Sequence, residues 1–150
     1  METENALHVF VDGVIHYFEH TDDKGVKVGS PYLADEVEPA MHDFTGIIGV
    51  SGPYKGSVYF SAPRLLLTHL LMSMGEADTG LENILDLVGE VANTISGNAR
   101  KTFGREFMIS VPVMIEGAIQ KLHTPKHTRC YVIPVYWKSY AASVVVCLEK

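Results

Sequence analysis

The sequence is poor in cysteine, in long apolar runs and in clustered basic residues, and each shortage excludes a class of protein. Two cysteines among 150 residues are too few for a disulfide scaffold. No segment reaches the roughly 20 apolar residues that a membrane-spanning helix needs. Residues 1–5 are acidic and lack the basic start of a secretory signal. We therefore expect a cytoplasmic protein without a membrane partner.

The charge of the chain argues against nucleic acid as a partner. The formal net charge is −6, and the stretch from Lys121 to Arg129 is interrupted by Pro125 and by histidines. Nucleic acids and anionic membranes are both bound by clustered lysine and arginine. The hydrophobic fraction of 47% and the charged fraction of 20% are typical of a globular protein. A chain of this length is expected to form a single domain over residues 1–150.

Hydrophobic periodicity and turn residues predict an α+β fold. Apolar residues recur at helical spacing over residues 5–20, Pro63 can start a second helix over 64–74, and a third helix over 81–103 has Thr79 as its expected cap and Gly104 as its end. Six strands are expected over residues 26–33, 43–51, 57–61, 106–116, 129–137 and 140–148. Short turns between strands favour a mostly antiparallel six-stranded sheet, with two long helices packed on one face and a short helix in addition.

The third helix carries a polar line that points away from its apolar side. At about 100° per residue, one arc of this helix is apolar. The residues within about 60° of the centre of the opposite side are Glu82, Asn83, Asp86, Glu90, Asn93, Gly97 and Arg100. Asp86, Glu90 and Asn93 are therefore expected to project together from a helix whose back lies in the core. Every amphipathic helix has a polar face, so the spacing alone leaves a solvated face as the alternative.

Two glycines, Gly89 and Gly97, border this line. A glycine inside a helix costs roughly 1 kcal/mol relative to alanine. That cost is easier to understand if another body approaches the helix closely at these positions. We therefore expect Gly89 and Gly97 to mark a contact surface.

The pattern Asp86-x-x-x-Glu90-x-x-Asn93 resembles the signature of the CheC/CheX/FliY chemotaxis phosphatases. That signature has aspartate or serine, then glutamate, then asparagine at the same helical steps, with a proline further on; here Pro112 follows a few residues sooner than usual. Residues 88–100 are most similar to the CheX version, and residues 28–32, 47–52 and 55–58 also resemble the family's first strand and hairpin. CheC proteins carry two sites, whereas the first helix here, around Asp12, has no second Glu-x-x-Asn.

The resemblance implies a CheC-like fold and a phosphatase for the aspartyl phosphate of a response regulator such as CheY. It assigns Asn93 to the attacking water and Glu90 to an ion pair with the regulator's active-site lysine. It implies Asp86, Gly89, Gly97 and Arg100 as partner-binding residues. No cofactor of its own is expected, because the regulator supplies Mg²⁺. A homodimer is also implied, since CheX proteins dimerise, and long β-branched strands with few edge charges invite pairing.

Some alternatives stay open from the sequence. The same fold also serves in flagellar switch proteins, so a non-catalytic module that binds a receiver or another subunit is the rival interpretation. His8, His16 and Glu19 of the first helix share a side with Asp12 and could hold a metal, although a solvated face is the better interpretation. His123 and His127 are interpreted as surface residues.

The two cysteines are expected to face each other across a hairpin. Cys130 and Cys147 fall in the last two expected strands, and Lys138-Ser139 can form the two-residue turn between them. In a reducing cytosol we expect buried, reduced thiols, with a redox role as the alternative.

Overall fold

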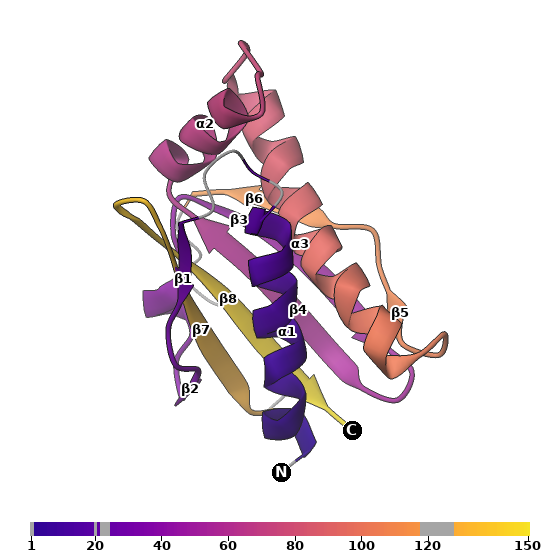
Figure 1. Cartoon of the computed structure of the whole chain (residues 1–150). Coiled ribbons are helices and arrows are strands. Elements are labelled where there is room, and N and C mark those ends of the chain that lie inside the picture. Colours follow the sequence, from indigo (N-terminus) through magenta and orange to yellow (C-terminus); the bar gives the residue numbers. More distant parts are fainter. Residues whose placement is uncertain (1, 20, 22–24, 118–127) are drawn as a thin grey trace.

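Figure 1 shows the computed structural model of the chain, which describes residues 2–19, 21, 25–117 and 128–150. The elements within these ranges are α1 (Glu2–Glu19), β1 (Val26–Val28), β2 (Tyr32–Ala34), a short 3-10 helix η1 (Glu38–Ala40), β3 (Phe44–Ser51), β4 (Lys55–Ala62), α2 (Arg64–Ser73), α3 (Leu81–Phe103), β5 (Met108–Ile109), β6 (Val113–Glu116), β7 (Cys130–Trp137) and β8 (Tyr140–Glu149). Among the helices in this part of the chain, none is long and apolar enough to cross a membrane.

The strands form one antiparallel sheet in the order β1-β7-β8-β4-β3-β5. Strand β2 also pairs with β7, and β6 also pairs with β3, so each outer edge is built from two short strands. The two long hairpins β3–β4 and β7–β8 lie at the centre, joined by the pairing of β4 with β8. The expectation of an α+β fold with a mostly antiparallel sheet is confirmed.

The count of six strands is wrong, because two of the expected strands are interrupted. The expected strand over 26–33 divides into β1 and β2 around Pro31, and the one over 106–116 becomes β5 and β6 around Pro112. A proline has no N–H to donate to the sheet, so a strand often ends or bulges beside it. The described sheet therefore has eight strands.

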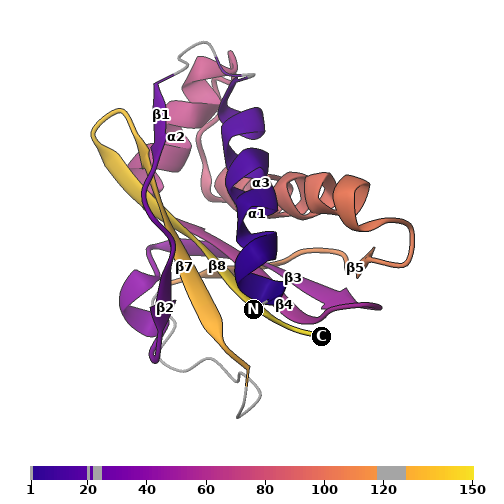
Figure 2. The ribbon, with the colours of Figure 1, turned by 60° about the horizontal axis from the view of Figure 1, so that its bottom comes forward.

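Both long helices cover the same face of the sheet, as predicted. Figure 2 shows α1 and α3 on one side of the strands and the segment around η1 on the other. The core between helices and sheet is built of fully buried apolar side chains, which include Phe10, Val14 and Phe18 of α1, Ile84, Val88, Val91 and Ile95 of α3, and Phe60, Ile133 and Val144 of the sheet. On the other face a smaller cluster around Val37, Tyr59 and Val145 lies under residues 34–41.

Helix α3 lies directly against strand β3 because Gly46 has no side chain. A Cβ at this position would stand 2.6 Å from the carbonyl oxygen of Val88 and 3.2 Å from Cβ of Ala92. Contacts of that length to a backbone atom are not tolerated, so a larger residue would push the helix off the sheet. Gly46 therefore sets the distance between α3 and the sheet, at the point where the exposed side of α3 carries the polar line.

The ends of α3 agree with the prediction except at the cap. The helix ends before Gly104, whose φ of 96° lies in the left-handed region that favours glycine. It begins after Gly80 rather than after a capping Thr79, and no side chain caps it. The turn before it is closed by Asp78 instead, whose Oδ1 accepts a hydrogen bond of 2.9 Å from the N–H of Gly80.

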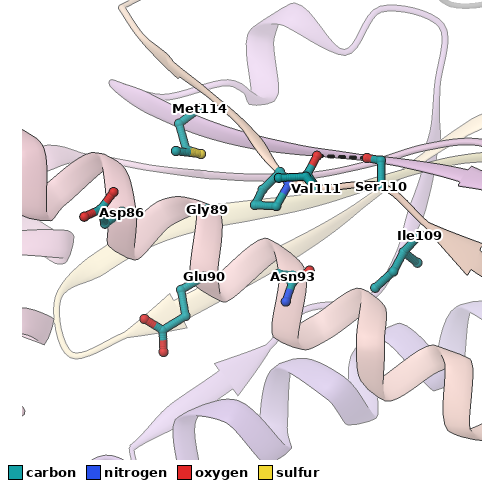
Figure 3. A pocket seen from close by; sticks show the side chains of 9 residues that line it. Asp86, Gly89, Glu90, Asn93, Ile109, Ser110, Val111 and Met114 are labelled. Carbon is teal, nitrogen blue, oxygen red and sulfur yellow. Dashed lines mark hydrogen bonds between the residues drawn. The ribbon is translucent and has the colours of Figure 1, made fainter.

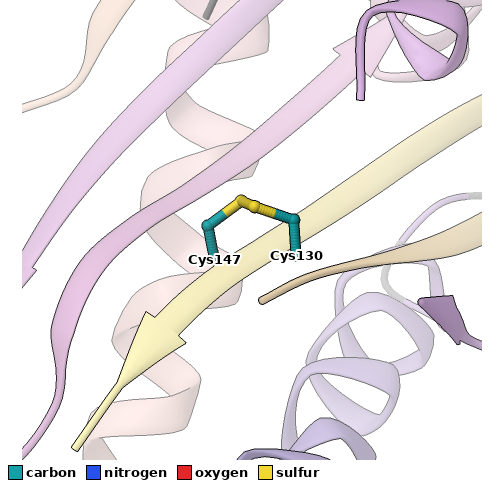
Figure 4. Close-up of a disulfide and its surroundings, with 2 residues drawn as sticks. All are labelled: Cys130 and Cys147. Atoms are coloured by element: carbon teal, nitrogen blue, oxygen red, sulfur yellow. A yellow bond between two sulfur atoms is a disulfide. The ribbon is translucent and has the colours of Figure 1, made fainter. Parts of the chain in front are cut away.

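The expectation of reduced thiols is wrong, because the structure joins Cys130 and Cys147 in a disulfide (Figure 4). The predicted hairpin is present, and its register places Cys130 directly opposite Cys147. The two Cα atoms are 4.2 Å apart, which is the spacing of a non-hydrogen-bonded pair in an antiparallel ladder. The two side chains point to the same face of the hairpin, where their sulfur atoms are bonded. The bond lies on the face away from α1 and α3.

Candidate functional site

The exposed side of α3 presents Asp86, Glu90 and Asn93 to solvent in one line. All three side chains are exposed, whereas the opposite side of the helix is buried in the core. The expected division of the helix into an apolar arc and a polar line is therefore confirmed. Because the buried side of the helix is packed in the core, the backbone that carries these polar side chains is fixed relative to the rest of the fold.

A hollow of about 620 Å³ lies between this line and the β5–β6 segment. One wall is formed by Asp86, Gly89, Glu90 and Asn93 of α3, and the other by Ile109, Ser110, Val111, Pro112 and Met114 (Figure 3). The two walls are brought together by β3, because α3 packs on this strand while β5 and β6 pair with its free edge. Pro112, which follows the helix a few residues sooner than the proline of the family signature, lines the hollow on the side opposite Glu90 and Asn93.

Ser110 fastens the second wall to the sheet. Its Oγ accepts a hydrogen bond of 2.8 Å from the N–H of Gly49 and donates one of 3.0 Å to the carbonyl oxygen of Val111. Its own N–H donates to the carbonyl oxygen of Gly49 at 2.9 Å. These hydrogen bonds fix the turn between β5 and β6, and the turn determines where Val111 and Pro112 lie.

The two glycines of α3 differ in their surroundings. Gly89 is buried, and a Cβ on it would stand 2.7 Å from Sδ of Met114 and 3.5 Å from Cβ of Pro112. The close approach that Gly89 permits is thus made by the second wall of the same chain. Gly97 is half-buried and has nothing within 4 Å of the same position, so nothing in the described chain requires a glycine there.

Arg100 lies near the end of the helix, away from the hollow. It is exposed, and its Nη2 donates a hydrogen bond of 3.3 Å to the carbonyl oxygen of Arg105. Of the residues predicted for the site, the structure gathers Asp86, Gly89, Glu90 and Asn93 around one hollow, while Gly97 and Arg100 lie outside its lining.

Tyr17 is a neighbour of Glu90 that the sequence did not reveal. A second hollow, of about 320 Å³, is lined by Tyr17 and His16 of α1 and by Glu90 and Thr94 of α3. Burial raises the pKa of the Tyr17 hydroxyl above its ordinary value, and the negative charge of Glu90 raises it further. The hydroxyl is protonated at neutral pH, as in any tyrosine with an ordinary or raised pKa, and can donate a hydrogen bond. In the sequence Tyr17 counted only as one member of the apolar repeat of the first helix.

The described residues contain no group of three or more histidine, cysteine, aspartate or glutamate side chains placed to hold a metal ion. Asp12 and Glu19, two of the residues weighed for a metal on α1, are exposed to solvent. His123 and His127 lie outside the described residues.

The exposed side of α3 combines an acid and an amide at neighbouring positions. Glu90 offers a negative charge, and Asn93, one turn further on, offers an amide that donates through its NH₂ and accepts through its carbonyl oxygen. Both stand on an exposed ridge rather than in an enclosed cleft (Figure 3). An exposed acid and amide on one anchored helix of an α+β fold are the features on which the sequence resembles the chemotaxis phosphatases.

Comparison with known proteins identifies the family. The family described as "Chemotaxis phosphatase CheX" matches residues 44–136, which include both walls of the hollow. The chain therefore belongs to the CheX family. A search of curated protein sequences found none that matches it.

Solved structures show the same fold over nearly the whole chain. A CheC-like superfamily protein from Shewanella sp. PV-4 is 25% identical with a TM-score of 0.83, and the match covers 97% of each chain. The chemotaxis protein CheX of Vibrio vulnificus is 24% identical with a TM-score of 0.83, covering 97% of this chain and 99% of that one. The CheX of Borrelia burgdorferi, solved as a complex with CheY, BeF₃ and Mg²⁺, is 19% identical with a TM-score of 0.78, covering 96% and 97%.

Proposed function

We propose that this protein accelerates hydrolysis of the aspartyl phosphate of a response regulator, with Asn93 and Glu90 as the working pair. The observation that carries the proposal is the position of the two side chains. They stand one turn apart on the exposed ridge of a helix whose other side is fixed in the core. A pair so placed can enter the active site of another protein, and the family to which the chain belongs is that of chemotaxis phosphatases.

Asn93 is proposed to hold the attacking water. An acyl phosphate is already activated, and the receiver contributes its own Mg²⁺ and lysine to neutralise the phosphoryl oxygens. A bond forms between the water oxygen and phosphorus while the bond from phosphorus to the receiver's aspartate oxygen breaks. The electron pair returns to the aspartate carboxylate, and both protons of the water leave with inorganic phosphate, as dihydrogen phosphate. Such a reaction is accelerated mainly by positioning, which one amide can provide.

Glu90 is proposed to pair with the receiver's active-site lysine. The carboxylate is exposed, and in Figure 3 it points away from the apolar wall that contains Met114. A charge pair across the interface would set the register of α3 in the receiver's site, and so place Asn93 in line with the phosphoryl group. Because the receiver is proposed to supply its own Mg²⁺, the phosphatase itself would need no metal.

The residues around the pair are proposed to complete the contact. Asp86 lies one turn before Glu90 on the same exposed line and borders the same hollow. Gly97 and Arg100 continue the ridge toward its end, where the absence of a side chain at Gly97 leaves room for a partner. The regulator is proposed to be a CheY-like receiver in the cytoplasm.

We also propose that the protein is a homodimer. Strands β1 and β2 lie at the free edge of the sheet away from the hollow, where the unpaired backbone groups of an edge can pair with another chain. Light scattering at micromolar concentration should give about twice the 16.5 kDa of one chain. A mass of one chain across a wide dilution range would contradict the dimer, but not the phosphatase, whose pair lies on one helix of one chain.

Multiple turnover separates the phosphatase from a non-catalytic receiver-binding module. A panel of receivers is phosphorylated, the phosphodonor is removed, and the protein is added at one-twentieth of the receiver concentration. A phosphatase should speed the loss of phosphate from the whole receiver pool. A module that only binds would leave the bulk rate at the receiver's own value for every receiver, which would contradict the proposal.

A further inference from the structure

A row of apolar side chains lines the same hollow as Glu90 and Asn93, and the proposed mechanism assigns no role to it. We call this row the apolar ledge; it consists of Ile109, Val111, Pro112 and Met114. Val111 is 83% exposed and Met114 is 36% exposed. Apolar side chains that gather in one row beside a polar pair, rather than being scattered singly, are typical of a surface that another molecule covers.

The ledge is held in place before any partner binds. Ser110 ties the backbone on one side to Gly49 and on the other to the carbonyl oxygen of Val111. The ring of Pro112 fixes its own φ angle and so limits the backbone beside Val111. On the other side of the row, Met114 packs into the space that Gly89 leaves open. A surface ordered in advance loses little conformational entropy when it is covered.

The sheet register shows which side chains of this segment face α3. Ile109 pairs with Val50 and Met114 pairs with Gly46, both on the face that carries the helices. Met108 and Val113 pair with Ser51 and Ile47, so they point to the other face. The register thus places Ile109 and Met114 on the side of the helices, and Val111 and Pro112 between them line the same hollow. Val113, which is 58% exposed, is an equally apolar position on the opposite side.

We infer that the apolar ledge is the second half of the docking surface for the receiver, an inference that rests on the proposed phosphatase function. The ledge and the acid–amide pair border a single hollow, so a body that brings its phosphoryl group to Asn93 also lies over Val111. The opposite wall carries the negative charges of Asp86 and Glu90. The surface therefore fits a receiver segment on which a cationic side chain stands beside apolar ones. The charged wall fixes the position of the receiver along α3, and the ledge adds affinity because apolar area is buried when the receiver binds.

The substitution Val111→Ser tests the ledge, with Val113→Ser as the matched control. Both replace an exposed valine by serine in the same segment, and only Val111 faces the hollow. We measure calorimetrically the binding of the receivers of the phosphatase panel, activated with beryllofluoride and Mg²⁺, so that the readout does not depend on hydrolysis. Val111→Ser should raise Kd about tenfold, the factor expected when burial of a valine is lost. Val113→Ser should bind like the unaltered protein, and in the hydrolysis assay the effect of Val111→Ser should fall on KM.

The other possible results distinguish failure of the ledge inference from failure of the proposed phosphatase function. If Val111→Ser binds as tightly as the unaltered protein while Asn93→Ala abolishes hydrolysis, the ledge inference is wrong and the phosphatase stands. If Val111→Ser leaves binding unchanged but halves the mass seen by light scattering, the ledge serves self-association and the inference is again wrong. If the unaltered protein neither binds nor dephosphorylates any receiver of the panel, the proposed function fails, and the ledge inference fails with it.

Discussion

A methyl group on Gly89 would stand 2.7 Å from Sδ of Met114, so the glycine allows the β5–β6 segment to pack directly on α3. Gly97, about two turns further along the same helix, has open space at the corresponding position. Each glycine lowers the intrinsic stability of the helix by a similar amount, but only Gly89 is required by a contact within the described chain. The second is explained if the body that approaches the helix there is the partner.

This difference predicts opposite effects of one substitution at two positions. Gly97→Ala should raise the free energy of unfolding by up to about 1 kcal/mol, because alanine favours the helix and meets nothing. Gly89→Ala should gain less or destabilise, because Met114 must move and part of the wall moves with it. Urea unfolding of both variants measures the difference, and equal changes at the two positions would contradict the packing described. The assignment of Gly97 to the partner surface is tested separately, by a weaker binding of the activated receiver to Gly97→Ala.

The proposed ion pair of Glu90 predicts coupling to the receiver's active-site lysine. Glu90→Ala should weaken both binding and stimulated hydrolysis, because it removes one member of a charge pair across the interface. With the receiver lysine replaced by alanine, the same change should have almost no further effect on Kd. A double-mutant cycle measures the coupling free energy. Independent, additive losses would show that Glu90 does not pair with that lysine.

The disulfide predicts a change in stability without a change in the site. Cys130 and Cys147 are separated by 17 positions, and closing a loop of about that length stabilises a fold by about 3 kcal/mol in the chain-entropy account. Reduction should therefore lower the free energy of unfolding by about 2 to 3 kcal/mol. Because the bond lies on the face away from α3, receiver binding should stay the same.

The control for this prediction is the variant in which both cysteines are replaced by alanine. It should unfold like the reduced protein and should not respond to the reductant. Thiol labelling shows whether the reductant has opened the bond. An unchanged free energy of unfolding in protein whose bond is open would contradict the predicted stabilisation by the disulfide.

The local part of the site could be predicted from the sequence, because it depends on one helix. Helical periodicity alone determines that Asp86, Glu90 and Asn93 share a side, and a regular helix from Leu81 to Phe103 keeps that relation. The antiparallel hairpin that brings Cys130 opposite Cys147 could be predicted for a similar reason. A two-residue turn determines the register of the strands that flank it.

The second wall could not be predicted, because it depends on pairing between segments far apart in the chain. The run over residues 106–116 has the composition of one strand, and only the pairing of β5 and β6 with β3 shows where Ser110 interrupts it. Tyr17 was likewise hidden, since its nearness to Glu90 arises from the packing of α1 beside α3. The oxidation of the cysteines is a chemical state that strand spacing permits but that the expected reducing compartment argued against.

The measurement that tests the central claim most directly is the rate of phosphate loss from the receiver in the presence of Asn93→Ala. Asn93 is exposed opposite the core, so its truncation should leave no cavity, and the variant should unfold and bind the activated receiver like the unaltered protein. Glu82→Ala, on the same side of α3 but outside the hollow, serves as the control and should retain full activity. The account predicts that Asn93→Ala reduces the rate to the receiver's own value while binding persists. Full stimulation by Asn93→Ala with a receiver that the unaltered protein dephosphorylates would contradict the account.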